Sequence, residues 1–313
     1  MPLGGGILVR AAVATSLDPM RTVYLGTSPF AVAVLERLAA SDHRPALVVT
    51  RPDRPRGRGR KLSPPPVADA ARTLGIDLIQ PASVNSDEAR AAISAVDPEA
   101  VAICAFGAYI REPLLSEHPM WNVHPSLLPR WRGAAPIERA LMAGDAETGV
   151  TIMRPTEEMD AGPICMQAGE PIRADDDYGS LAERLQELGG ELLVRSFDER
   201  PPFVEQPSEG VTLADKIGPE DRRLDPALDA VTLERRVRAL TPHIGAFLEA
   251  PERLGVRRAA AQLDGAVPAG RLAARDGRLL FGTAAGALEL LEVVPPGSRP
   301  MDAAAYLRGH GLP

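Results

Sequence analysis

The strongest constraint on this chain is an alternation of short apolar runs with helical stretches from Thr22 onward. Short runs rich in Val, Ile, Leu and Ala are typical of strands buried on both faces, and the amphipathic stretches between them are typical of helices. Strands that alternate with helices form right-handed βαβ units and an open, mostly parallel sheet. The predicted strands are 22–25, 46–50, 100–104, 150–153 and 164–168, and the predicted helices are 29–40, 67–74, 87–96 and 181–197.

The pattern changes after a proline-rich stretch that contains Pro201, Pro202 and Pro207. A helix near 233–240 is followed by short glycine-bounded segments, which are typical of a small β-barrel of the oligonucleotide-binding kind. We therefore predict a Rossmann-like α/β sheet joined to a C-terminal OB-like β-barrel. The predicted strands of this barrel are 270–272, 278–282 and 287–294. The predicted divisions are an extension at 1–19, a catalytic domain at 20–199, a linker at 200–224 and the barrel domain at 225–313.

Length and charge fit this division. A chain of 313 residues is longer than a domain with a single hydrophobic core usually is, so two domains are expected. From Pro207 onward acidic and basic residues balance, so the net charge of −7 lies in the first two thirds. Two cysteines, Cys104 and Cys165, cannot form a disulfide framework, which favours a reducing cytoplasm.

The first 19 residues lack the pattern of a folded element. Their apolar run is interrupted by Arg10 and has no basic leader, which argues against a secretory signal or a membrane span. Two interpretations stay open here: a disordered tail, or an over-extended start with Met20 as the true initiator.

The stretch from Trp121 to Ile137, WNVHPSLLPRWRGAAPI, is the first candidate site. Asn122 and His124 are two residues apart at the end of a predicted strand, so both side chains point to one face. Pro125 ends the strand, and open α/β sheets bind ligands at the carboxyl ends of their strands. Taken alone, an N-x-H pattern is more typical of a structural histidine than of a catalytic one.

Further along the chain, Asp160 lies in a tight turn with the sequence MDAG. Such a turn most often has only a structural role, in which the Asp side chain bonds its own backbone. Asp160 becomes a candidate catalytic residue only as a third member of a group with Asn122 and His124. The sequence shows neither the G-x-G-x-x-G nor the P-loop spacing, which argues against a nucleotide-phosphate site. The histidines at 43, 118, 124, 243 and 310 lack the spacing of metal ligands, so no metal is expected.

The segment RPDRPRGRGRK, residues 51–61, carries six basic residues and one acidic residue. Its prolines and glycines predict an exposed loop without helix or strand. A solvated surface loop explains any one of these charges, but the cluster in an acidic domain favours contact with a nucleic-acid backbone. Arginines at 253, 257, 258, 271, 275 and 278 are compatible with phosphate contact too, and equally with a soluble surface.

Together, NVHPSLLP, WRGAAPI, TGVTIM and DAG resemble the folate-dependent formyltransferases, which use 10-formyltetrahydrofolate. WRGAAPI and the basic segment are most similar to the methionyl-tRNA formyltransferase family. The resemblance covers essentially Met20 to Pro313 and is loose in the last hundred residues. The acidic turn reads MDAG where the family more often has LDTG.

The resemblance implies transfer of the formyl group to the α-amino group of methionyl-initiator tRNA, by a monomer that needs no metal. Formyl transfer to an amine passes through a tetrahedral oxyanion and moves protons on both nitrogens. The implied catalytic residues are Asn122, His124 and Asp160. The implied folate-binding residues are Ser126, Leu127, Leu128, Pro129, Phe106, Gly107 and Ile110. The implied tRNA-binding residues are Arg54, Arg56, Arg58, Arg60 and Lys61.

Three other functions stay open from the residues. A sugar-nucleotide N-formyltransferase would share the catalytic half and would not need the basic segment. A formyltetrahydrofolate hydrolase would use water in place of the amine. A non-catalytic tRNA-binding protein would bind tRNA without turning over folate.

Overall fold

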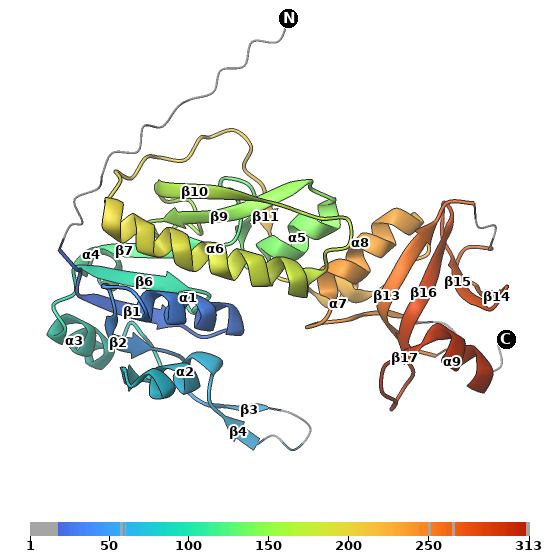
Figure 1. Cartoon of the computed structure of the whole chain (residues 1–313), viewed down its shortest axis with the longest axis horizontal. Coiled ribbons are helices and arrows are strands. Elements are labelled where there is room, and N and C mark those ends of the chain that lie inside the picture. Colours follow the sequence, from blue (N-terminus) through green and yellow to red (C-terminus); the bar gives the residue numbers. More distant parts are fainter. Residues whose placement is uncertain (1–17, 57–58, 60, 250–251, 265–266, 311–313) are drawn as a thin grey trace, which may run out of the picture.

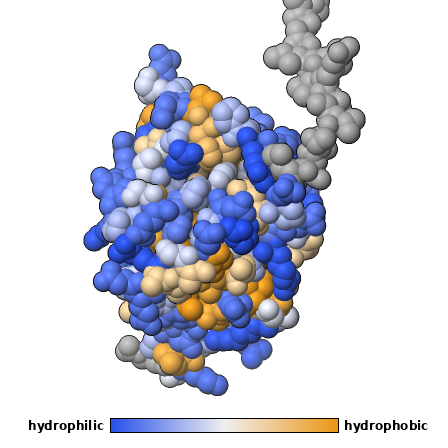
Figure 2. Space-filling model, turned by 90° about the vertical axis from the view of Figure 1, so that its left-hand side faces the viewer, coloured by the Kyte–Doolittle hydropathy of each residue, from blue (hydrophilic) through white to orange (hydrophobic). Residues whose placement is uncertain are grey.

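The computed structural model of the chain describes residues 18–56, 59, 61–249, 252–264 and 267–310. Figure 1 shows two β-sheets at opposite ends of an elongated molecule, with helix α8 between them. Residues 1–17, which contain most of the predicted extension, lie outside the described residues. Figure 2 views the end remote from the C-terminal sheet: its surface is mostly hydrophilic, with apolar side chains in small patches.

The N-terminal sheet has seven strands in the order β10-β9-β7-β6-β1-β2-β5. The five strands from β7 to β5 are parallel, and β9 and β10 are antiparallel additions. This confirms the predicted open, mostly parallel sheet. The chain leaves β1 towards β2 and returns to β6 on the other side, which creates a crevice between the carboxyl ends of β1 and β6. The bounds are β1 Thr22–Gly26, β2 Pro45–Val49, β5 Asp77–Ile79, β6 Ala100–Cys104, β7 Met120–His124, β9 Glu147–Met153 and β10 Ile164–Pro171.

Helices cover both faces of this sheet. Along β1, Tyr24 faces a core shared with α1 and α6, whereas Val23 and Leu25 face a second core shared with α3 and α4. Two glycines of α6 permit close packing: a Cβ at Gly189 would lie 2.9 Å from Val123 and one at Gly190 2.8 Å from the Cβ of Arg37. The bounds are α1 Pro29–Ala39, α2 Pro66–Leu74, α3 Asp87–Ala95, α4 Leu114–Glu117, α5 Pro136–Ala143 and α6 Tyr178–Glu199.

The basic segment differs from its prediction. Two short strands, β3 Arg54–Arg56 and β4 Lys61–Ser63, pair antiparallel into a ribbon that projects from the sheet (Figure 1). The prediction that prolines and glycines prevent a strand was therefore wrong. A two-stranded ribbon consists only of edge strands, and an edge strand tolerates a proline such as Pro55. The predicted exposure of the segment is confirmed at Arg54 and Lys61.

The C-terminal sheet is antiparallel, in the order β12-β13-β16-β15-β14 with β17 paired to β16, which agrees with the predicted small β-domain. Helix α8 covers it with Leu233, Val237 and Leu240. We did not predict β13, because its alanines are unusual in strands. The bounds are β12 Ala246–Leu248, β13 Leu254–Gln262, β14 Leu272–Arg275, β15 Arg278–Gly282, β16 Ala287–Val294, β17 Met301–Asp302, α8 Ala230–Leu240 and α9 Ala303–Gly309.

The stretch between α6 and α8 has structure of its own. After α6 the chain runs back over the β10 side of the sheet (Figure 1). It then forms β11, Leu213–Ala214, and the short helix α7, Pro219–Arg222. Strand β11 pairs in parallel with β8, Arg132–Gly133. Residues 200–214, called the connecting segment below, are thus paired with the N-terminal half of the chain.

Charged contacts hold the two sheets' helices together at the junction. The buried Asp176 receives hydrogen bonds from Arg184 at 2.7 and 2.8 Å, and its carbonyl oxygen accepts one from Arg238 of α8 at 2.7 Å. Burial alone would raise the pKa of Asp176, but hydrogen bonds from Arg184, the Arg173 amide and Ser180 lower it to about 2. Nearby, Arg139 of α5 binds Asp221 of α7 at 2.7 Å.

Replacing Asp176 with alanine should lower the free energy of unfolding by about 3 kcal/mol at pH 7, because a pKa lowered to about 2 corresponds to roughly that stabilisation of the folded state. The pKa of Asp176 in the folded state is depressed below the unfolded value near 3.9, so its contribution to the free energy of unfolding is complete above about pH 4. This contribution is lost as the pH falls towards 2. Urea unfolding of wild type and Asp176→Ala between pH 7 and pH 2.5 measures the difference. The exposed Asp175→Ala is the control, and a difference that is independent of pH would contradict the assignment.

Candidate active site

The site lies at the carboxyl end of β7, next to the crevice between β1 and β6. His124 is the last residue of β7 and is buried, and Asn122 shares its face by strand alternation. Strand β7 lies between β6 and β9, so its end is held from both sides. This agrees with the predicted position of the pair at a strand end.

Backbone contacts fix the imidazole ring of His124. Its Nε2 lies 2.9 Å from the carbonyl oxygen of Trp131. Because a carbonyl oxygen can only accept, Nε2 carries a proton and donates to it. The other ring nitrogen, Nδ1, is turned towards Asp160, whose Oδ2 atom lies 3.6 Å from it.

Asp160 is aimed at the histidine by its backbone. It has a left-handed conformation, with φ at 49°, and the amide of Gly133 donates to its Oδ2 atom at 2.8 Å. The turn is closely packed as well: a Cβ on Gly162 would lie 1.9 Å from the carbonyl oxygen of Arg154. The structure thus brings His124 and Asp160 together although 36 residues separate them in the sequence.

Asn122 keeps a hydrogen-bond donor available. Its side-chain Nδ2 is 3.6 Å from the thioether sulfur of Met153, on the neighbouring strand β9. A thioether is a weak acceptor, so a stronger acceptor on a substrate can replace it. Asn122 thus brings a replaceable donor to the strand face that also carries His124.

The loop after β7 is shaped from inside. Ser126 is buried and its hydroxyl donates to the Arg130 carbonyl oxygen at 2.6 Å, and Leu128 is buried as well. Leu127 packs against Gly149, where a Cβ would lie 2.6 Å from its Cδ2 atom. The carbonyl of Pro129 accepts from the amide of Thr212 at 3.3 Å. The side chains of Ser126 and Leu128 are thus occupied within the protein, whereas those of Leu127 and Pro129 remain partly exposed.

The second predicted ligand loop follows β6. Phe106 is buried and lines a cavity of about 280 Å³ together with Arg51, Asn85 and Arg111. Gly107 accepts a hydrogen bond from the Arg51 guanidinium at 2.6 Å, and Ile110 packs on the core between the sheet and α3. Arg51 and Pro52, which immediately precede the β3–β4 ribbon, are part of the cavity wall. Of the predicted tRNA-binding residues, Arg58 and Arg60 lie outside the described residues, and Arg54, Arg56 and Lys61 belong to the ribbon.

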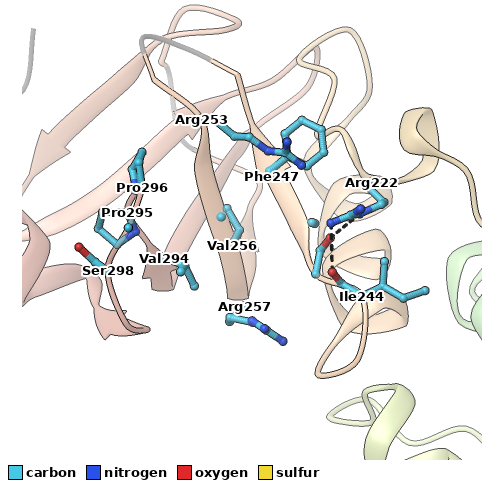
Figure 3. Close-up of a pocket in the computed structure, with 14 residues that line it drawn as sticks. Arg222, Ile244, Phe247, Arg253, Val256, Arg257, Val294, Pro295, Pro296 and Ser298 are labelled. Carbon is cyan, nitrogen blue, oxygen red and sulfur yellow. Dashed lines mark hydrogen bonds between the residues drawn. The ribbon is translucent and has the colours of Figure 1, made fainter. Parts of the chain in front are cut away.

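A second concave surface lies in the C-terminal domain, where a groove of about 320 Å³ is bordered by arginines (Figure 3). Arg253 stacks on the ring of Phe247, with its guanidinium carbon 3.8 Å from the ring centroid. Arg222 donates to the carbonyl oxygens of Ile244 and Gly245, both at 3.2 Å. Arg257 lies at the edge of the same groove.

Several residues that hold the site were not predicted. Asp145 accepts hydrogen bonds from Arg130 at 2.6 and 2.8 Å and from the Trp131 indole at 2.8 Å. The hydroxyl of Thr212 accepts from the Trp131 amide at 2.8 Å. These contacts fix Trp131 in a left-handed conformation, with φ at 65°, and so hold the carbonyl that binds His124. No local sequence pattern marks such long-range partners.

In the part of the chain that the structure describes, no three His, Cys, Asp or Glu side chains come together in a way that would hold a metal ion. Within the same residues, no helix has the length and apolar character needed to span a bilayer. Cys104 is buried, and burial raises the pKa of its thiol to about 12, which makes it a poor nucleophile at neutral pH.

Comparison with known proteins identifies both halves of the chain. A family model described as formyl transferase matches residues 20–197, and one described as formyl transferase, C-terminal domain, matches residues 216–311. Methionyl-tRNA formyltransferase from Halorhodospira halophila is 44% identical over 303 residues, which is 93% of this chain and 97% of the relative. The one from Clavibacter sepedonicus is 44% identical over 93% of this chain and 97% of its own length.

Solved structures share the fold at lower identity. HypX from Aquifex aeolicus in complex with tetrahydrofolic acid has a TM-score of 0.60 and 20% identity, over 92% of this chain and 47% of that one. An N-formyltransferase from Helicobacter canadensis, in complex with folinic acid and dTDP-3-aminofucose, has a TM-score of 0.64 and 12% identity, over 87% and 98%. These likenesses concern the fold, whereas the near full-length relatives identify the family. The chain therefore belongs to the methionyl-tRNA formyltransferase family.

Proposed function

We propose that this protein transfers the formyl group of 10-formyltetrahydrofolate to the α-amino group of methionyl-initiator tRNA. The observation that carries the proposal is the convergence of His124 and Asp160 at 3.6 Å beside the amide of Asn122, in a chain of this family. The product, N-formylmethionyl-tRNA, would serve translation initiation. The proposed setting is a monomer in the cytoplasm that uses no metal.

The proposed mechanism assigns one role to each side chain. The incoming amine attacks the formyl carbon, a new C–N bond forms, and the carbonyl oxygen becomes an oxyanion. Asn122 and protonated His124 donate hydrogen bonds to that oxygen. Because the Nε2 proton of His124 is engaged by Trp131, its donation to the oxyanion comes from Nδ1. Asp160 sustains the imidazolium and accepts the proton that the amine loses. It passes this proton to the folate nitrogen as the bond between that nitrogen and the formyl carbon breaks.

For the folate we propose the two loops implied by the family resemblance. The loop of Ser126, Leu127, Leu128 and Pro129 would contact it mainly through the partly exposed Leu127 and Pro129, since Ser126 and Leu128 are buried. Phe106, Gly107 and Ile110 would form the apolar wall for the pterin. No protein nucleophile enters this scheme, because the amine attacks the formyl carbon directly.

For the tRNA we propose two contact surfaces. The basic segment, with Arg54, Arg56, Arg58, Arg60 and Lys61, would enter the acceptor arm, because clustered positive charge suits a nucleic-acid backbone. The C-terminal domain would hold the inside of the L-shaped molecule, and the arginine-bordered groove supports this assignment. The proposed domain limits follow from these roles: a catalytic domain at 20–199, a connection at 200–224 and a tRNA-binding domain at 225–313.

A formyl-transfer assay with radiolabelled formyl donor tests the reaction. Wild type should formylate charged initiator methionine tRNA and discriminate against the charged elongator form. Asn122→Ala should lower kcat about 100-fold or more, because one oxyanion donor is removed. Transfer to amino-sugar nucleotides in place of tRNA would identify a sugar N-formyltransferase. Release of formate without any acceptor would identify a hydrolase.

Neutralising Arg58 separates tRNA contact from catalysis. Arg58→Ala should raise the Michaelis constant for tRNA and leave that for the formyl donor unchanged, since the charge would act only on the phosphate backbone. Steady-state kinetics at fixed salt measures both constants. Arg195→Ala, which removes an exposed arginine from α6, is the matched control. Equal damage to both constants by Arg58→Ala would refute the role assigned to the segment.

A further inference from the structure

The connecting segment runs along the catalytic site and pairs with both parts of it. Val204 exchanges two backbone hydrogen bonds with Ile164 at the start of β10, each at 2.8 Å. Further on, Thr212 and Ala214 bind the loop after β7 through Pro129, Trp131, Arg132, Ala134 and Ala135. The segment thus touches the Asp160 side of the site at one end and the His124 side at the other.

Gln206 joins these two sides through one amide group. Its Nε2 donates to the carbonyl oxygens of Asp160 and Gly162, both at 2.8 Å. Its Oε1 accepts from the Arg132 guanidinium, at 3.0 Å from Nε and 2.8 Å from Nη2. Both amide hydrogens and the amide oxygen are therefore engaged. The orientation of the amide is determined: carbonyl oxygens can only accept hydrogen bonds, so the NH₂ group must be the one that faces them.

These bonds act on the backbone that aims Asp160. A left-handed conformation at a non-glycine residue costs free energy and persists only where its surroundings hold it. The two bonds from Gln206 hold the carbonyls on either side of Ala161 and so fix the turn. On the other side, Gln206 holds Arg132, and the next residue, Gly133, donates its amide to the Asp160 carboxylate at 2.8 Å. The turn and its partner loop are thereby tied to the same side chain.

We propose that Gln206 is a positioning residue for formyl transfer, which acts through Asp160 on His124. Without its amide, the Asp160 turn can relax, and the carboxylate moves away from His124 and from the Gly133 amide. The inference rests on the proposed function only in one respect, the expected effect of Gln206 on the rate of formyl transfer. The structural link between Gln206 and the Asp160 carboxylate stands apart from the identity of the substrates.

The kinetic test compares Gln206→Ala with Glu205→Ala, an exposed neighbour. Gln206→Ala should lower kcat roughly 10- to 100-fold, as a small misplacement of a catalytic group does, with both Michaelis constants and the unfolding midpoint close to wild type. Glu205→Ala should match wild type. Raised Michaelis constants with an unchanged kcat would overturn the proposal.

A second variant separates the two halves of the amide. Gln206→Glu keeps an acceptor for Arg132 but replaces the two donated bonds with repulsion between a carboxylate and two carbonyl oxygens. Its kcat should fall at least as far as that of Gln206→Ala. Activity near wild type would show that only the bond to Arg132 matters, which would overturn the role assigned to the Asp160 turn.

Combination with Asp160→Ala tests whether Gln206 acts through Asp160. In that background, Gln206→Ala should reduce kcat by less than about 2-fold further, since residues that act through one group are not additive. A further loss as large as in wild type would show an independent, merely structural effect and would overturn the proposal.

Hydrogen exchange of the Gly133 amide gives a readout that needs no activity. That amide is bonded to the Asp160 carboxylate, so Gln206→Ala and Asp160→Ala should both accelerate its exchange, and Glu205→Ala should not. Unchanged exchange in Gln206→Ala would overturn the inference. If the exchange responds but wild type does not formylate methionyl-tRNA, the proposed function fails and the positioning role stands.

Discussion

The hydrogen bond between His124 Nε2 and the carbonyl oxygen of Trp131 is the contact on which the site depends. It gives the imidazole one orientation, with Nδ1 turned towards Asp160. The carbonyl is in place only because Trp131 has a left-handed backbone, which would be strained without support. Asp145 supplies that support from the indole side and Thr212 from the amide side. A single ring position thus depends on residues from three separate stretches of the chain.

The same arrangement explains how much of the molecule could be predicted from its sequence. Strands β1, β2 and β6 follow from apolar runs, and α1 was predicted at 29–40, because these patterns are local. Asn122 and His124 were placed correctly at a strand end for the same reason. The β3–β4 ribbon was missed because its pairing across the glycines outweighs the local effect of Pro55. Strand β13 was missed because pairing with β12 and β16 outweighs the low strand preference of alanine.

The supporting residues of the site could not be predicted from local patterns. Gln206 lies 46 residues from Asp160, and its role depends on carbonyl oxygens, which every residue has. Thr212 lies 81 residues from Trp131 and reads in the sequence as part of a linker. Asp145 follows a helix-ending glycine, which gives it the appearance of an ordinary turn residue. In each case the role of the residue is revealed by which atoms it contacts in the folded chain, and not by its residue type.

The parallel pairing of β11 with β8 bears on how such enzymes could be recombined or diversified. Gly133 has room for this pairing only because it lacks a side chain: a Cβ there would lie 2.7 Å from the Ala214 carbonyl oxygen. A chimera that exchanges C-terminal modules at the end of α6 would bring foreign residues against the loop after β7, whose Trp131 carbonyl binds His124. A crossover placed after Ala214 would transplant the module and leave the host's catalytic scaffold intact. Evolutionary shuffling of the tail would meet the same boundary.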